Sequence, residues 1–249
     1  MGGRLLLLIL ICLITCGLAS ADTINATNVD YSRAMSIYMN EKGTVVSGLA
    51  GVILIDLTTG GNTYHRDTLC VDLYIDILLG QTYHTVVTDP NGATALSGKP
   101  NLGLVSWMID NALLPGQQTF LSALPAIDWV TTPQQGAGLQ LAIWDLVEDN
   151  GDGLDKGNLQ ASTTPGELTD PGVLYWANTY EAIALGELAH PTDLAYVYVN
   201  DQNGTGAQML EGPQYIDGGP EPFPEPSTFG LGGGGLLAAA FFSLRKKIR

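Results

Sequence analysis

The 249-residue sequence is 45% hydrophobic, which is enough to form a sizeable core, and it has a formal net charge of −15. Residues 22–226 contain all 25 acidic residues but only five of the ten basic ones, so this stretch has a net charge of −20. Such a charge repels nucleic acid and anionic lipid surfaces, and we expect neither as its partner. The charge suits a soluble extracellular protein in a calcium-containing or sugar-rich setting, and the alternative is that it serves solubility alone. The five basic residues are Arg33, Lys42, Arg66, Lys99 and Lys156.

The first 21 residues have the pattern of an export signal. Arg4 precedes an apolar run, 5–18, and the small-x-small sequence 19–21 follows it. The run is too short to span a bilayer, which disfavours a retained membrane helix. We therefore predict a signal peptide over 1–21. Two of the three cysteines lie in it, so the exported chain would hold Cys70 alone and could form no intramolecular disulfide.

Hydrophobic periodicity predicts the strands. In 64–79 apolar and polar residues alternate, which places Cys70 on a polar sheet face. We expect this strand to form a hairpin with 83–88, and 89–99 to be a polar loop. Residues 22–40 show no clear period, which predicts an irregular or edge element. The segments expected to be strands are 44–58, 64–79, 83–88, 194–200 and 207–210.

Three later segments have helical spacing. The middle one has the clearest start, because Thr132 is a good N-cap and Gln135 stands where a capping box needs it. On this helix Gln140 and Trp144 lie one turn apart at the edge of the apolar stripe, so we expect Gln140 to be half-buried. A loop, 115–131, precedes it. The predicted helices are 102–113, 133–148 and 171–184.

These elements predict one α+β domain over 22–211, with an antiparallel β-sandwich or barrel and about three packed helices. The stretch 212–223 is rich in proline, glycine and acidic residues, which is typical of a linker. The remaining residues, 224–249, form a separate tail.

Two short motifs carry a resemblance to a known family. The strand motif 68–72 is followed by the helix motif 139–145, and the two resemble, in kind and order, the motifs of thioester domains in bacterial surface adhesins. The resemblance also implies a β-rich barrel or sandwich with helices packed against it. It assigns Cys70 as the thioester sulfur, Gln140 as the acyl donor, and Trp144 and Asp72 as supporting residues.

A thioester of this kind forms when the cysteine sulfur attacks the glutamine carbonyl and ammonia leaves. Holding the two groups in contact can supply about 7–11 kcal/mol of the barrier. An amine or hydroxyl on a target then displaces the thiolate, and the protein becomes covalently attached. We expect no turnover enzyme and no cofactor for this chemistry.

Other roles for Cys70 remain open in the sequence. The protein could be a structural module that binds an extracellular matrix and forms no thioester. Cys70 could instead be the nucleophile of a Cys/His hydrolase, with His84 or His65 as the base. Zinc binding by His65, Cys70 and His84 is disfavoured, because the sequence has no paired-ligand spacing.

The acidic turn 148–153 resembles the first half of a calcium-binding loop. Oxygen-bearing side chains alternate with other residues, and a glycine stands at the tight turn. The twelfth position holds Leu159 in place of the usual glutamate, so we expect a turn, with calcium as the alternative. The ligands would be Glu148, Asn150 and Asp152.

The tail has three parts in a fixed order: Pro224, Glu225 and Pro226, then the uncharged segment 227–244, then a basic cluster. It closely resembles the PEP-CTERM sorting signal. The resemblance implies an exosortase that processes the tail, a membrane anchor before processing, and a final place at the cell surface or in a polysaccharide matrix. We therefore predict an exported surface or matrix protein with an adhesive role.

Overall fold

The computed structural model describes residues 22–73, 75–113, 130–186, 195–201 and 209–213. They belong to a compact unit that ends at Tyr215, and a second unit comprises Ile216–Arg249. The predicted signal peptide, the loop 115–131 apart from its last two residues, nearly all of the linker, and Pro224, Glu225 and Pro226 lie outside the described residues. In the described part of the chain, no helix is long and apolar enough to cross a membrane.

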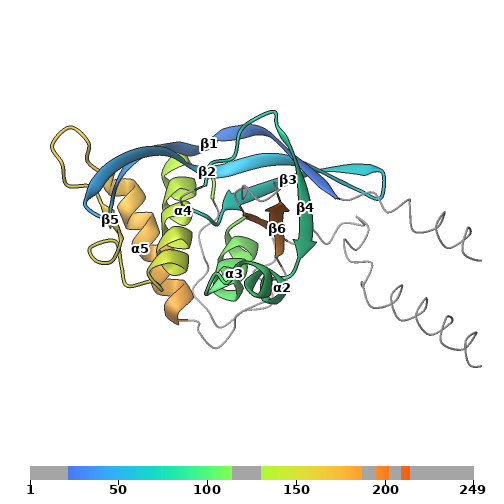
Figure 1. Cartoon of the computed structure of the whole chain (residues 1–249). Helices are drawn as coiled ribbons and strands as arrows, with labels where there is room; N and C mark the ends of the chain where they lie inside the picture. The colour runs from blue at the N-terminus through green and yellow to red at the C-terminus, as the bar shows by residue number, and fades with distance from the viewer. Residues whose placement is uncertain (1–21, 74, 114–129, 187–194, 202–208, 214–249) are drawn as a thin grey trace, which may run out of the picture. The chain divides into compact units, whose positions relative to one another are not determined.

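The described chain forms one antiparallel sheet and four helices, a mixed α+β fold as predicted (Figure 1). The strand order is β2-β3-β7-β6-β4-β1-β5, and β2 also pairs with β1, so six strands form a closed ring of pairings. The arrangement is thus a single closed sheet and not a sandwich of two. The strands are β1 (Thr23–Glu41), β2 (Thr44–Thr59), β3 (Asn62–Cys70), β4 (Thr82–Thr88), β5 (Leu159–Ala161), β6 (Tyr196–Asp201) and β7 (Leu210–Gly212).

The longest strand, β1, is where the sequence predicted an irregular element. Its pairing with β2 shifts register between Ala26 and Asn28 and again between Val29 and Ala34. After each shift the buried residues change from one set of alternate positions to the other. A regular period of two is therefore not visible in the sequence. Gly51 lies opposite the second shift, where a Cβ would clash with the Arg33 carbonyl oxygen.

The prediction for 64–79 was wrong in its second half. Strand β3 ends at Cys70, and the chain then leaves the regular ladder, although Val71 N still donates to Met209 O (2.8 Å). Strand β4 does not form a hairpin with β3, because it pairs with β6 and β1. Apolar and polar residues also alternate in this irregular connection, so the pattern alone does not distinguish it from a strand.

The predicted loop 89–99 contains a short helix, α2 (Pro90–Ser97). Asp89 caps its start by accepting a hydrogen bond from Gly92 N (2.6 Å), and Gly98 ends it in the left-handed conformation. Pro90 stands at the start of this helix and Gly98 at its end, whereas the prediction placed both residues in a loop.

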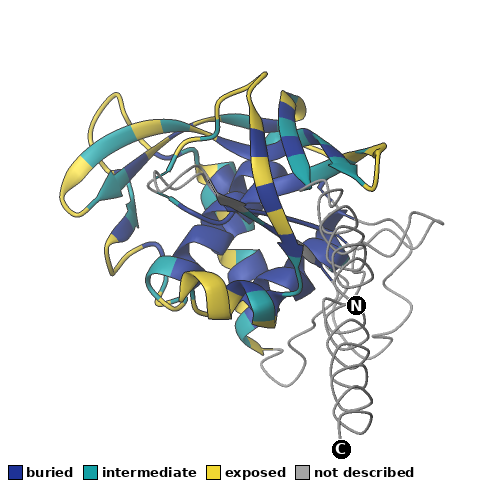
Figure 2. Ribbon diagram, turned by 45° about the vertical axis from the view of Figure 1, so that its right-hand side comes forward, coloured by how far each residue is buried: buried dark blue, intermediate teal, exposed yellow. Residues whose placement is uncertain are grey.

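The three predicted helices are all present: α3 (Leu102–Leu113), α4 (Pro133–Glu148) and α5 (Pro171–Gly186). The capping box of α4 is confirmed, since Thr132 Oγ1 accepts from Gln135 N and Gln135 Oε1 accepts from Thr132 N. Helix α4 contacts β1, β2 and α5. Figure 2 shows that the buried residues gather between the sheet and the helices. Helix α4 is therefore buried on almost all sides.

Candidate functional site

Cys70 is the last residue of β3, where it pairs with Leu210 of β7. Its exposed fraction is 7%, and it is the one cysteine in the described ranges. Its neighbours Leu69 and Val71 are buried as well, so both faces of the sheet are covered at this point and the polar face predicted for Cys70 is not open to solvent.

Gln140 reaches Cys70 from the middle of α4. Its Oε1 accepts a hydrogen bond from Cys70 N (2.9 Å), and its Nε2 donates to Cys70 O (2.6 Å). Gln140 has an exposed fraction of 1%, so the predicted half-buried position is also wrong. The helix edge that was expected to be half-buried lies against the sheet. The buried amide has partners for both of its polar atoms, as an interior polar group requires.

This contact places the Gln140 side chain against the main chain of Cys70. The carboxamide spans the main chain of Cys70, and Sγ is two covalent bonds from the Cα of that same residue. The Gln140 carboxamide and Cys70 are therefore neighbours in the buried interior.

Trp144 lies one turn after Gln140 and is 5% exposed. It lines a pocket of about 300 Å³ together with Leu73 and Ile75, which follow Cys70. Glu41, Ser47 and Asp76 add polar groups to the same pocket. The pocket thus adjoins both segments that carry the candidate reactive pair.

Asp72 holds the chain just after Cys70. Its Oδ2 accepts from Met209 N (2.8 Å), and its Oδ1 pairs with Lys99 Nζ (3.1 Å). Lys99 also pairs with Glu148 at the end of α4 (2.6 Å). Burial alone would lower the pKa of Lys99, but hydrogen bonds to the two carboxylates raise it, so the ammonium is kept. The Lys99 ammonium therefore links the segment after Cys70 to the helix that carries Gln140.

A buried acid beside the site had no signal in the sequence. Glu211 of β7 pairs with Leu69, and its side chain is fully buried. Ser106 Oγ donates to Glu211 Oε1 (2.7 Å). Burial raises the pKa of Glu211 well above its usual value, the Ser106 hydrogen bond opposes this, and the charge of Asp110 adds to it.

The histidines proposed as partners of Cys70 point elsewhere. His65 Nδ1 pairs with Asp56 (2.5 Å), and the His65 side chain is 88% exposed. His84 is an exposed residue of β4, and β6 and β7 separate β4 from β3 in the sheet. Cys70 is buried, so neither histidine shares its environment. The hydrolase and zinc interpretations gain no support from this arrangement.

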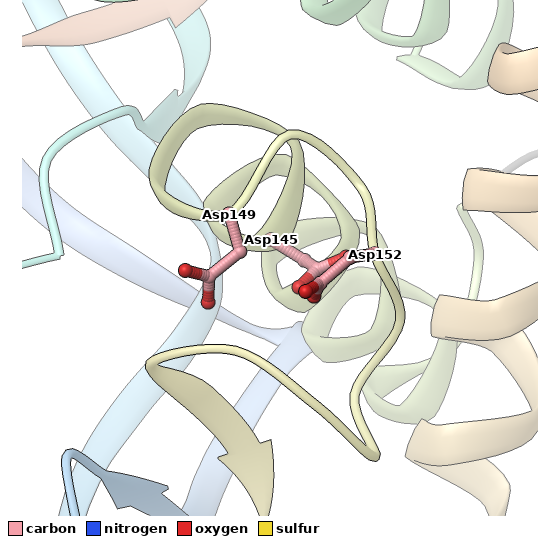
Figure 3. Close-up of side chains that lie close together, drawn as sticks. All are labelled: Asp145, Asp149 and Asp152. Atoms are coloured by element: carbon pink, nitrogen blue, oxygen red, sulfur yellow. The ribbon is translucent and has the colours of Figure 1, made fainter.

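The three residues predicted to bind calcium do not form one site, because each has different partners. Glu148 pairs with Lys99, and Asn150 Oδ1 accepts from Asn101 Nδ2 (3.4 Å). Asp152 instead lies with Asp145 and Asp149 in an acidic cluster at the end of α4 (Figure 3).

Comparisons with known proteins give one structural likeness to report. No family model and no curated protein matches the chain. Among solved structures, the chain is similar to the N-terminal domain of the Streptococcus pyogenes pilus tip adhesin Cpa. The two share 10% sequence identity at a TM-score of 0.42, over 80% of this chain and 100% of that one.

Proposed function

We propose that Cys70 and Gln140 form an internal thioester, and that the protein is an exported surface protein that attaches covalently to its target through this bond. One observation carries the proposal: the Gln140 carboxamide makes two hydrogen bonds to the main chain of Cys70. A purely structural glutamine could make the same bonds, so the chemistry needs a direct test.

The bond forms without an external reagent. The Cys70 thiol gives up its proton, and its sulfur attacks the carbonyl carbon of Gln140. The carbon–nitrogen bond breaks, the nitrogen takes the proton, and ammonia leaves. Both residues are buried, at exposed fractions of 7% and 1%, so bulk water has little access to the product.

A target amine completes the reaction. It attacks the same carbonyl carbon, the carbon–sulfur bond breaks, an amide forms, and the Cys70 thiol is restored. Each molecule reacts once because the acyl group is consumed, so the protein does not turn over. We propose that the target approaches through the pocket lined by Trp144 and Leu73, which adjoins the helix of Gln140 and the segment after Cys70.

The location follows from the two ends of the sequence. We propose that the signal peptide directs export and that an exosortase processes the tail at Pro224, Glu225 and Pro226. The tail would hold the chain in the membrane until it is processed. The released form would then lie at the cell surface or in a polysaccharide matrix.

Intact mass of the native, purified protein tests the thioester. We expect a mass one ammonia below that of the sequence, resistance of Cys70 to thiol reagents, and gain of one methylamine on incubation with that amine. Cys70→Ala and Gln140→Ala should each have the full mass of their own sequence.

Gln160→Ala is the matched control, because the Gln160 side chain is partly exposed and donates to Gly157 O (3.1 Å), so its removal should not affect the mass loss. Full sequence mass and an alkylatable Cys70 in freshly prepared native protein would contradict the thioester. That result would leave the structural, matrix-binding module as the better interpretation.

A further inference from the structure

The acidic cluster at the end of α4 is distinct from the Cys70–Gln140 site. Asp145 belongs to the last turns of the helix, and Asp149 and Asp152 belong to the loop that follows. Each contributes a carboxylate oxygen, and these oxygens lie within 4.8 Å of one another. In Figure 3 the carboxylates of Asp145 and Asp152 come together below the loop.

Asp145 is the buried centre of this cluster, with an exposed fraction of 0%. Its Oδ2 accepts a hydrogen bond from Gly153 N (3.1 Å), but no described residue donates to its Oδ1. Glu181 of α5 is its neighbour, is 6% exposed, and has an Oε2 that likewise has no donor in the described ranges. Two ionised carboxylates cannot donate to each other, so this pair requires either a proton shared between Asp145 and Glu181 or a cation.

No side chain of the described residues supplies that cation. The ion pairs of lysine, arginine and histidine in these ranges involve other acids: Asp30, Asp56, Asp67, Asp72 and Glu148. Burial, together with the neighbouring charges, raises the pKa of Asp145 to about 6 and that of Glu181 to about 7. Lys156 Nζ lies close to this loop, but it donates to the main-chain oxygen of Asp152 (3.4 Å).

The loop turns sharply, and Asp149 Oδ2 accepts hydrogen bonds from Asn158 N and Leu159 N across it (2.8 Å each). Asn150, Gly151 and Gly153 have positive φ angles of 61°, 71° and 95°. A Cβ at Gly157 would lie 2.6 Å from Asp149 Cγ and 2.9 Å from Asp152 Oδ1. A side chain at position 157 would thus occupy the space where the two carboxylates approach each other.

We propose that Asp145, Asp149 and Asp152 bind a divalent cation of the calcium type, with the Glu181 carboxylate beside them. Calcium prefers oxygen ligands at about 2.3–2.6 Å, so two ligands of one ion lie at most about 5 Å apart, as they do here. The buried Asp145 oxygen without a donor points to a ligand, which a solvated acidic surface would not need. The cluster contains no nitrogen or sulfur ligand, which disfavours zinc.

The site would tie three elements together. Asp145 lies five residues after Gln140 on the same helix, Asp152 belongs to the loop, and Glu181 belongs to α5. A bound ion would therefore fix the end of the helix that presents Gln140. The inference does not rest on the thioester, because its residues and its readouts are separate.

Thermal unfolding of the full chain in calcium or in EDTA provides the test. We expect 1 mM calcium to raise Tm by about 4 °C or more, because ligands that bind only the folded state stabilise it. Terbium is a second probe, since Trp144, next to Asp145, can sensitise its luminescence. Asp145→Asn and Asp152→Asn should abolish both the Tm shift and the terbium signal. Asp145→Asn also removes charge repulsion, so it should fold in EDTA.

Glu148→Gln is the matched control, because it removes one negative charge beside the cluster from a residue that pairs with Lys99. It should keep the calcium shift. If calcium does not raise the Tm of the unaltered chain, the proposal is overturned. A proton shared by Asp145 and Glu181 would then be what neutralises the pair. A shift that survives Asp145→Asn and Asp152→Asn, or that disappears in Glu148→Gln alone, would also overturn it.

Discussion

A Cβ at Gly136 would clash with the main-chain carbonyl oxygen of Arg33, so the first turns of α4 lie directly against the backbone of β1. Gly138, two residues on, similarly leaves room for Trp176 of α5. Gly136 lets α4 lie close to the sheet, where the Gln140 side chain reaches Cys70, and Gly138 lets α5 lie close to α4. The glycine pattern therefore positions the candidate reactive pair.

We predict that Gly136→Ala pushes α4 away from β1 and separates Gln140 from Cys70. Overpacking at a rigid backbone contact should lower the free energy of unfolding by about 3 kcal/mol or more. The ammonia loss measured by intact mass should also disappear. Gly48→Ala is the control, because a Cβ there meets no atom within 4 Å. Unchanged mass loss in Gly136→Ala would show that α4 need not approach β1 so closely.

The two variants that remove the thioester should differ in stability. Gln140→Ala leaves the buried N–H and C=O of Cys70 without their partners, at a cost of about 1–3 kcal/mol for each group. Cys70→Ala keeps both hydrogen bonds, because they involve only the main chain. We therefore expect urea unfolding to find Gln140→Ala less stable than Cys70→Ala by about 2 kcal/mol or more. Equal stabilities would mean that the amide contact contributes little.

Much of the helical part could be predicted from local sequence. The capping box at Thr132 and the apolar spacing of three segments identified helices that the structure contains. Strand β1 could not be predicted, because its bulges remove the period of two on which such a prediction depends. The closed ring of strands depends on contacts far apart in sequence, which no local pattern encodes.

The candidate site was predicted in identity but not in environment. The resemblance of two short motifs to thioester domains joined Cys70 to Gln140, and the structure brings the two residues into contact. Both are more buried than predicted. Burial depends on which elements cover a face, and the local sequence does not show this. Glu211 was missed for the same reason, since nothing local marks a strand acid as buried.

Processing at both ends can be checked on the protein recovered from the producing cells. We predict that the mature chain starts near Asp22 and ends near Pro226, because the export pattern and the sorting tail flank that stretch. Terminal peptide mapping of the released surface form is the measurement. Recovery of peptides from 241–249 in that form would contradict processing of the tail.

The buried Glu211 predicts a dependence of stability on pH. In the unfolded chain its pKa is near the usual 4.5, and in the folded protein burial raises it well above that value. Above about pH 4.5 the folded state therefore holds a proton that the unfolded state has lost, so stability falls as pH rises toward the folded pKa. Glu211→Gln removes this penalty while keeping an acceptor for Ser106. We expect the variant to have a Tm at least about 3 °C higher at pH 8 and a smaller difference near pH 5.

Thermal unfolding between about pH 5 and pH 8 measures this effect, since that window lies above the unfolded pKa. Glu167→Gln makes the same chemical change at an exposed position and should follow the unaltered protein at every pH. Asp110, whose charge raises the pKa of Glu211, should act in the same direction, so Asp110→Asn is expected to reduce the pH dependence in part. A Glu211→Gln curve parallel to that of the unaltered protein would mean that Glu211 does not hold a proton in the folded state.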